Sequence, residues 1–294
     1  MGRSGLVVGA VLLLAACSGG GGGGTAAPSA TPTPYGSVLD QALAPINTGL
    51  GKAAAATTKP DLDSALGTVE SNAGRAVRSL NAAGTPGEAE AARTELVNGL
   101  TALSAESSAL RSDLVKRKLC TVGAAQARLG GGQGLSGVSA ALAKLTAAGY
   151  RTALTVPEFP KPPAKPRTLE NGTMVREGAK DGSGSVELNN DSPDDAVFTL
   201  AVNGKSVASV FAAKGRRTGI EGVEAGSYDF YLTTGVDWDS EAKQFTQDCD
   251  FIKYQDQYTF KPAGTKWKVD LGPGDGSQGY AKVQGQTVNS APQP

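Results

Sequence analysis

Apolar residues in the first half of the chain recur at intervals of three and four positions, a spacing that places them on one face of a helix. The first series consists of Leu39, Leu43, Ile46 and Leu50. The second series follows a break at Lys59-Pro60 and consists of Leu62, Leu66, Val69, Ala73, Val77 and Leu80. Both series predict amphipathic helices that bury one face against a neighbour.

A third helix is predicted to begin in a Thr-Pro-Gly-Glu sequence, where Thr85 can cap the helix and Glu88 completes a capping box. Its apolar series runs towards Cys120, and a last helix follows the three glycines at 130–132. Together these helices predict an antiparallel bundle over residues 37–150. We interpret its leucine and alanine stripes as core, while a groove for a partner helix stays open as an alternative.

The pattern changes after Arg167 to short runs in which apolar and polar residues alternate. In one run Tyr228, Phe230 and Leu232 share a face, as expected for a strand with one side buried. The Asn203-Gly204 pair between two such runs indicates a hairpin turn. Seven to nine strands of this kind predict an immunoglobulin-like antiparallel β-sandwich over residues 169–290, followed by a tail at 291–294.

The two halves are joined by a proline-rich segment over residues 151–168. Its prolines favour an extended polyproline II conformation, so we expect a stiff spacer between the domains. The chain of 294 residues is thus predicted to be an α+β protein of two domains, an N-terminal bundle and a C-terminal sandwich.

A short apolar run from Leu6 to Ala16 follows Arg3 near the start of the chain. It is roughly half the length needed to cross a bilayer, so we interpret residues 1–16 as a signal peptide. Residues 17–36 are rich in glycine and proline and predict a flexible tether.

The sequence Leu14-Ala15-Ala16-Cys17 resembles the lipobox of bacterial lipoproteins. The resemblance implies that Cys17 receives a diacylglycerol, that the signal is cut before it, and that the protein is anchored by lipid to the extracellular face of the cell membrane. An ordinary signal peptide with an incidental cysteine is the alternative.

Composition excludes several kinds of chemistry. The formal net charge is zero, so no overall basic field favours nucleic acid as a partner. The chain has no histidine, which removes the commonest general base, the serine and cysteine triads and every histidine metal site. We expect no cofactor.

Two cysteines remain after Cys17, at Cys120 and Cys249. In an exported protein we expect them to form a disulfide that links the two halves. Two thiols buried separately would be the alternative.

One acidic stretch is a candidate ligand site. Asp237 and Asp239 flank Trp238, and Asp248 and Asp250 follow closely. Four carboxylates around an exposed tryptophan could hold calcium or a sugar ring. The interpretation we favour is a turn in which Trp238 plugs the end of the sandwich and the aspartates make Asx-turn hydrogen bonds, with no metal and no catalytic residue.

The second half also resembles a β domain of secreted proteins and lipoproteins of actinobacteria. The residues that carry the resemblance are Asp195-Ala196-Val197, Gly226, Tyr228, Gly235, Asp237-Trp238-Asp239, Phe245, Cys249 and Phe251. The resemblance implies a compartment and a fold, but no chemistry.

These observations lead us to expect a non-catalytic surface lipoprotein, in which a helical stalk presents a β-sandwich that binds a cell-wall component or an envelope protein. One alternative is an envelope hydrolase that uses the paired carboxylates of Asp237, Asp239, Asp248 and Asp250. The other is a purely structural spacer.

Overall fold

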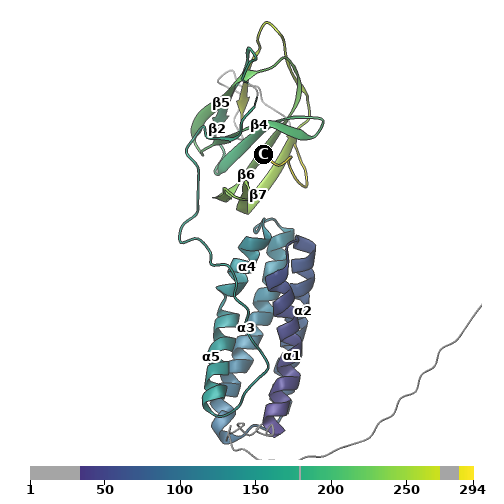
Figure 1. Cartoon of the computed structure of the whole chain (residues 1–294), viewed down its shortest axis with the longest axis vertical. Helices are drawn as coiled ribbons and strands as arrows, with labels where there is room; N and C mark the ends of the chain where they lie inside the picture. Colours follow the sequence, from purple (N-terminus) through teal and green to yellow (C-terminus); the bar gives the residue numbers. More distant parts are fainter. Residues whose placement is uncertain (1–33, 179, 272–284) are drawn as a thin grey trace, which may run out of the picture. The chain divides into compact units, whose positions relative to one another are not determined.

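The computed structural model describes residues 34–178, 180–271 and 285–294. The signal-like segment, Cys17 and the tether as far as residue 33 lie outside the described residues. The described part contains five α-helices followed by a mostly antiparallel β region (Figure 1). The predicted α+β class is therefore confirmed.

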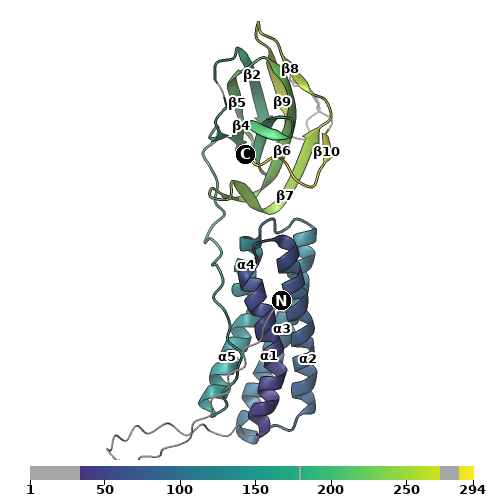
Figure 2. The same cartoon turned by 45° about the vertical axis from the view of Figure 1, so that its right-hand side comes forward.

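Four long helices and one short helix form the bundle. They are α1 (Pro34–Ala55), α2 (Lys59–Ala82), α3 (Glu90–Val115), α4 (Val122–Gly130) and α5 (Gln133–Ala147). In Figures 1 and 2 the long helices run side by side, with α3 packed on both α2 and α5. The first predicted apolar series is fully buried, which confirms its assignment to the core. No helix within the described residues is both long and apolar enough to cross a membrane.

The structure confirms one predicted helix boundary and corrects another. The predicted break between the first two helices is confirmed at residues 56–58, and Lys59-Pro60 itself forms the first turn of α2. The Thr58 side chain caps this turn and accepts a hydrogen bond from the Asp61 amide at 3.3 Å. The capping box at Thr85 is wrong, because a 3₁₀ turn at Gly87–Ala89 without a side-chain cap precedes α3. The Glu88 carboxylate instead accepts a hydrogen bond from the Tyr150 hydroxyl at 2.8 Å.

The third helix ends earlier than predicted. Arg117 takes a left-handed conformation just after α3, with φ of 59°, and a separate helix, α4, follows from Val122. The buried Gln126 amide of α4 donates to the carbonyl oxygens of Ala53, Ala54 and Ala56 at 2.8, 3.1 and 3.0 Å. These bonds satisfy carbonyls that the C-terminal end of α1 would leave unpaired.

The first half of the proline-rich segment packs on the bundle. Leu154 and Phe159 of the segment are buried within the core cluster of the bundle, next to Tyr150 that precedes the segment. The Ala153 amide donates to Asp40 Oδ1 at 2.8 Å. The first half of the segment therefore differs from the predicted free spacer, because its apolar side chains are packed against the helices of the bundle.

The β region contains two sheets. The larger has the strand order β1 (Met174–Arg176), β4 (Lys205–Ala212), β3 (Asp195–Val202), β6 (Gly226–Asp239), β7 (Gln244–Tyr254) and β10 (Gly285–Thr287), with β8 (Tyr258–Phe260) on β6. The smaller has the order β5 (Arg216–Val223), β2 (Gly184–Asn190) and β9 (Lys266–Asp270). The prediction of a wholly antiparallel module is wrong at one pair, because β2 and β9 are parallel.

The predicted hairpin between β3 and β4 is confirmed. Asn203 and Gly204 both have positive φ, at 51° and 73°. This combination matches the right-handed twist of the two strands, and asparagine and glycine adopt it at low cost.

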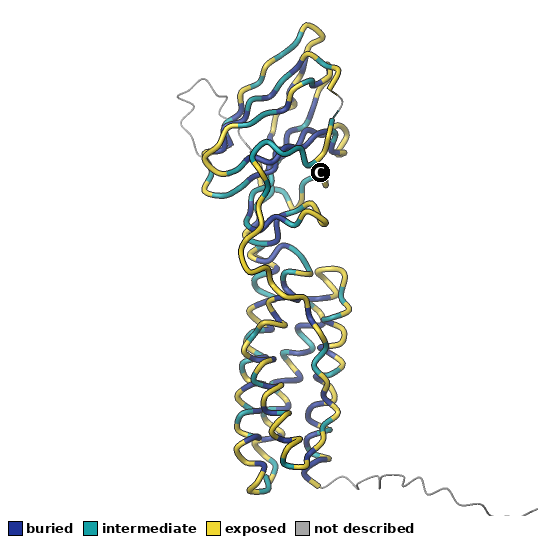
Figure 3. The backbone as a smooth tube through the Cα atoms, turned by 60° about the vertical axis from the view of Figure 1, so that its left-hand side comes forward, coloured by how far each residue is buried: buried dark blue, intermediate teal, exposed yellow. Residues whose placement is uncertain are grey.

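The central strand β3 is buried on both faces. Its residues 196–201 are all buried, and Figure 3 shows dark blue buried stretches running through the β region. Phe198 and Leu200 enter a core cluster with side chains of the smaller sheet. Val197 belongs to a second cluster on the opposite face, with Phe211 and Trp238. Strand β3 therefore needs cover on the face that the smaller sheet does not reach.

Glycines allow close packing of α3 and α5. A Cβ atom added to Gly99 of α3 would lie 2.7 Å from the Val138 amide nitrogen and 2.9 Å from the Gly137 carbonyl carbon. Because both neighbours are backbone atoms of α5, a side chain can be accommodated only if the helices separate.

We predict that Gly99→Ala lowers the free energy of unfolding of the bundle by about 1–3 kcal/mol, through overpacking of this contact. Gly51→Ala is the matched control, because Gly51 is exposed inside α1 and no atom lies within 4 Å of its added Cβ. It should stabilise the bundle by about 0.5–1 kcal/mol. Urea titrations followed by helical circular dichroism measure both changes, and equal effects would contradict the prediction.

Candidate functional site

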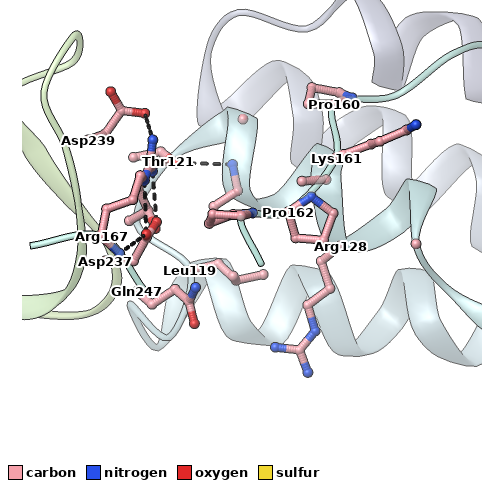
Figure 4. Close-up of a pocket in the computed structure, with 16 residues that line it drawn as sticks. Leu119, Thr121, Arg128, Pro160, Lys161, Pro162, Arg167, Asp237, Asp239 and Gln247 are labelled. Atoms are coloured by element: carbon pink, nitrogen blue, oxygen red, sulfur yellow. Dashed lines mark hydrogen bonds and ion pairs between the residues drawn. The ribbon is translucent and has the colours of Figure 1, made fainter. Parts of the chain in front are cut away.

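Asp237 of β6 is a buried carboxylate that makes four hydrogen bonds (Figure 4). The backbone amide and Nε of Arg167 each donate to its Oδ1 at 2.9 Å, and Nη2 of Arg167 donates to Oδ2 at 2.7 Å. The Thr246 hydroxyl donates to the same Oδ2 at 2.6 Å. The side chain of Asp237 is 1% exposed, so these bonds replace the water that its charge loses on burial.

The backbone around Asp237 fits this role. Asp237 has φ of 60°, a left-handed conformation that aspartate tolerates better than most residues. The amide of the next residue, Trp238, donates to the Arg167 carbonyl oxygen at 2.8 Å. The residue that pairs with the carboxylate is therefore also held by the backbone of β6.

Asp239 closes the turn after β6. Its Oδ1 accepts from the backbone amides of Glu241 and Ala242, both at 3.0 Å, and its Oδ2 accepts from Nη1 of Arg167 at 3.2 Å. Asp239 thus makes the Asx-turn hydrogen bonds of the interpretation that we favoured. Asp237 does not, because it accepts hydrogen bonds from Arg167 and Thr246 instead.

The same contacts set the ionisation of the cluster. Hydrogen bonds from Arg167 lower the pKa of Asp237 to about 2. The Ala242 amide is the main cause that lowers the pKa of Asp239. Hydrogen bonding to Asp237 in turn raises the pKa of Arg167. All three groups are therefore charged at neutral pH.

A cavity of about 440 Å³ lies beside this cluster. One wall comes from α4, including Ala124, Ala127 and Arg128, and another comes from Pro160 to Pro163. Figure 4 shows Arg128 and Lys161 extending from these walls, away from Asp237. The cavity is large enough for part of a ligand or a short peptide segment.

Several polar side chains beside the cavity are already engaged in hydrogen bonds within the fold. Asp237 and Asp239 are ionised and hold Arg167, so neither has the raised pKa of a general acid. The Thr121 hydroxyl accepts a hydrogen bond from the Ala124 amide at 3.1 Å and caps α4. These side chains position the backbone and the charges around the cavity.

The predicted disulfide is confirmed. Cys120 and Cys249 are bonded, and both are nearly buried. The backbone beside them also pairs, because the Cys120 amide donates to the Thr246 carbonyl at 2.8 Å and the Cys249 amide donates to the Arg117 carbonyl at 3.0 Å. Residues 117–120 therefore run along the first half of β7, with an isolated antiparallel bridge between Leu119 and Gln247.

The other predicted site residues do not come together as a site. Trp238 is 2% exposed and packs against Phe211 and Phe245, which agrees with the favoured interpretation of a buried plug. The alternative with an exposed tryptophan is wrong. Asp250 pairs with Arg117 at 3.5 Å instead of facing Asp237. Within the ranges that the structure describes, no group of three or more acidic, cysteine or histidine side chains could hold a metal ion.

Arg167 and Thr246 are the site residues that the sequence did not reveal. Arg167 precedes Asp237 by 70 positions, and nothing in the local pattern links the two. The only signal is the position of Arg167 at the end of the proline-rich segment, where the alternating pattern begins.

Comparisons of the chain with protein-family models, with curated proteins and with solved structures found no match.

We predict that Asp237→Asn lowers the free energy of unfolding of the β region by about 2 kcal/mol at pH 7. A carboxylate whose pKa is lowered by folding stabilises the protein above its ordinary pKa, and this stabilisation is lost as the pH falls through about 2. The difference between the variant and the wild type should therefore shrink between pH 5 and about pH 2. Urea unfolding at a series of pH values measures it.

Asp248→Asn is the control for this experiment. Asp248 is exposed and also left-handed, with φ of 48°, and asparagine accepts that conformation. We expect little change in stability at any pH. The difference in the free energy of unfolding between the wild type and Asp237→Asn should not stay constant from pH 7 to pH 3. A constant difference would contradict the role assigned to the Asp237 charge.

We further predict that Cys120 and Cys249 resist alkylation in the unfolded, unreduced chain. Their separation of 129 residues makes the bond worth roughly 5 kcal/mol in the chain-entropy model. Reduction should therefore lower the urea midpoint of the β region. Mass spectrometry after alkylation checks the bond, with Cys17→Ser as a background that removes the third thiol. Two alkylated residues would show that the prediction is wrong.

Proposed function

We propose that this chain is a non-catalytic lipoprotein, held on the extracellular face of a bacterial cell membrane through Cys17. The observation that carries the proposal is the use of its cysteines. The chain has three, and Cys120 pairs with Cys249. The remaining thiol, Cys17, directly follows the Leu14-Ala15-Ala16 sequence that resembles a lipobox. A structural disulfide is also typical of an exported protein.

The physical properties of the first residues suit an anchor. Each buried CH₂ of an acyl chain contributes about 0.8 kcal/mol, so several chains hold a protein durably on a membrane. The glycine-rich composition of residues 18–24 fits the tether that such an anchor requires. In this proposal the helical bundle acts as a stalk.

The β region is proposed as the binding module, with the architecture of an immunoglobulin-like sandwich. One core cluster takes Phe198 and Phe230 from the larger sheet and Val186 and Val269 from the smaller sheet, which supports two packed layers. An actinobacterial source fits the resemblance of residues 195–251. The ligand classes proposed are a cell-wall component or an envelope protein.

The contacts of the carboxylates weigh against a hydrolase. A glycosidase of the common type needs one carboxyl group that keeps its proton near neutral pH. Asp237 has a lowered pKa and uses its oxygens to hold Arg167 and Thr246. A purely structural spacer remains the alternative if the β region binds nothing.

The anchor is tested by expressing the full chain and its Cys17→Ser variant in a bacterium that processes lipoproteins. We expect the wild type in the membrane fraction, with acyl groups on Cys17 detected by mass spectrometry. The variant cannot form the thioether and should lose both the acyl groups and the membrane retention.

The double variant Cys120→Ser/Cys249→Ser serves as the matched cysteine control, and it should keep its acyl groups on Cys17. A wild-type chain that is dissolved in the culture fluid and carries no fatty acid would overturn the proposal. The same holds if Cys17→Ser fractionates like the wild type.

A further inference from the structure

One face of the larger sheet is covered by a segment that the sequence predicted to be a tail. Val197 and Thr199 alternate along β3 with core residues, so their side chains lie on the face opposite the smaller sheet. Both are only 2% exposed. The described residues that lie against this part of the face include 291–294, the predicted tail.

Residues 288–294 are held on the sheet by specific contacts. The Val288 amide donates to the Phe251 carbonyl oxygen at 2.9 Å, and Nη2 of Arg117 donates to Asn289 Oδ1 at 3.3 Å. Beyond them, residues 291–294 line a cavity of only about 20 Å³ together with Thr199, Trp238 and Phe251. Such a space holds about one water molecule, so the segment fits the face closely.

The segment has little conformational freedom to lose when it binds. Pro292 and Pro294 have fixed φ angles, and Ala291 and Gln293 each precede a proline, which restricts them to extended conformations. Residues 291–294 form no helix or strand in the structure. Short proline peptides of this type bind surfaces lined by aromatic side chains, because they enter them already ordered.

The surface beneath the segment has the matching chemistry. Trp238 and Phe251 supply aromatic rings, and Thr199 and Thr233 line the same space. The Arg117 guanidinium lies 5.5 Å from the centre of the Phe251 ring, at the distance of a cation–π contact. We call the surface formed by Val197, Thr199, Thr233, Trp238 and Phe251 the outer groove.

We propose that the outer groove is a recognition site for an extended Pro-x-Pro peptide of a partner protein, and that residues 291–294 occupy it as a built-in ligand. The proposal rests on the role of the β region as the binding module, but not on the lipid anchor. The chain's own Pro-Gln-Pro shows which chemistry the groove accepts. A partner peptide must displace it, and a tethered segment competes at an effective concentration of about 1 mM.

The test uses the full chain with Cys17→Ser and a fluorescent peptide of the sequence Val-Asn-Ser-Ala-Pro-Gln-Pro. The double variant Pro292→Gly/Pro294→Gly weakens the built-in ligand, because it removes both rings and restores freedom to the backbone. We expect this variant to bind the peptide at least about tenfold more tightly than the chain that keeps Pro292 and Pro294. The same peptide with both prolines replaced by alanine should lose most of the affinity.

Pro193→Gly/Pro262→Gly is the matched control, since it makes the same exchange at two exposed prolines of the β region that line neither the outer groove nor the cavity beside α4. It should leave peptide binding unchanged. Nuclear magnetic resonance on each variant checks that the sheet is intact and whether the Phe251 amide responds to peptide. Equal affinities for the tail variant and the control, with the sheet intact, would overturn the proposal.

A dimer that forms at high concentration and disappears in the tail variant would also overturn it, because the groove would then take the tail of a second copy. Failure of the anchor is recognised separately, since peptide binding is measured on a chain without Cys17.

Discussion

The larger sheet has two apolar faces, and this single constraint organises the rest of the β region. The smaller sheet has three strands and covers one face, while β3 is buried on both. An aromatic face left in water loses the hydrophobic stabilisation of each side chain on it, about 1.5–3 kcal/mol for a large one. The opposite face is therefore covered by segments without regular structure, which include Leu169 and residues 291–294.

Such segments need fastening, because an extended chain has no internal hydrogen bonds to hold it. The ion pair of Arg167 with Asp237 fastens the segment that enters the β region. The Cys120–Cys249 bond, with its flanking backbone pairs, fastens residues 117–120 to β7. The carboxylates that resembled a ligand site are thus used to hold the fold. In the proposed function, recognition therefore uses the outer groove instead.

The sequence by itself determined the elements whose cause is local. The spacing of Leu39, Leu43 and Ile46 fixes which face of α1 is apolar, and any helix at that position must bury it. Asn203-Gly204 determined the hairpin between β3 and β4, because few other pairs accept two positive φ angles. The cysteine pairing was also predictable from the sequence, because only two cysteines follow Cys17 and they had one possible partner each.

The tertiary structure alone decided which side chains meet across long separations. Local periodicity shows that a residue faces inward, but it does not say which partner it finds there. Arg167 binds Asp237, which lies 70 positions later in the chain. The side chain of Trp238 is buried. Strand β9 pairs with β2 in parallel. The predicted spacer and tail likewise became packed segments. In each case the bundle and the larger sheet presented apolar surface that only a distant part of the chain could cover.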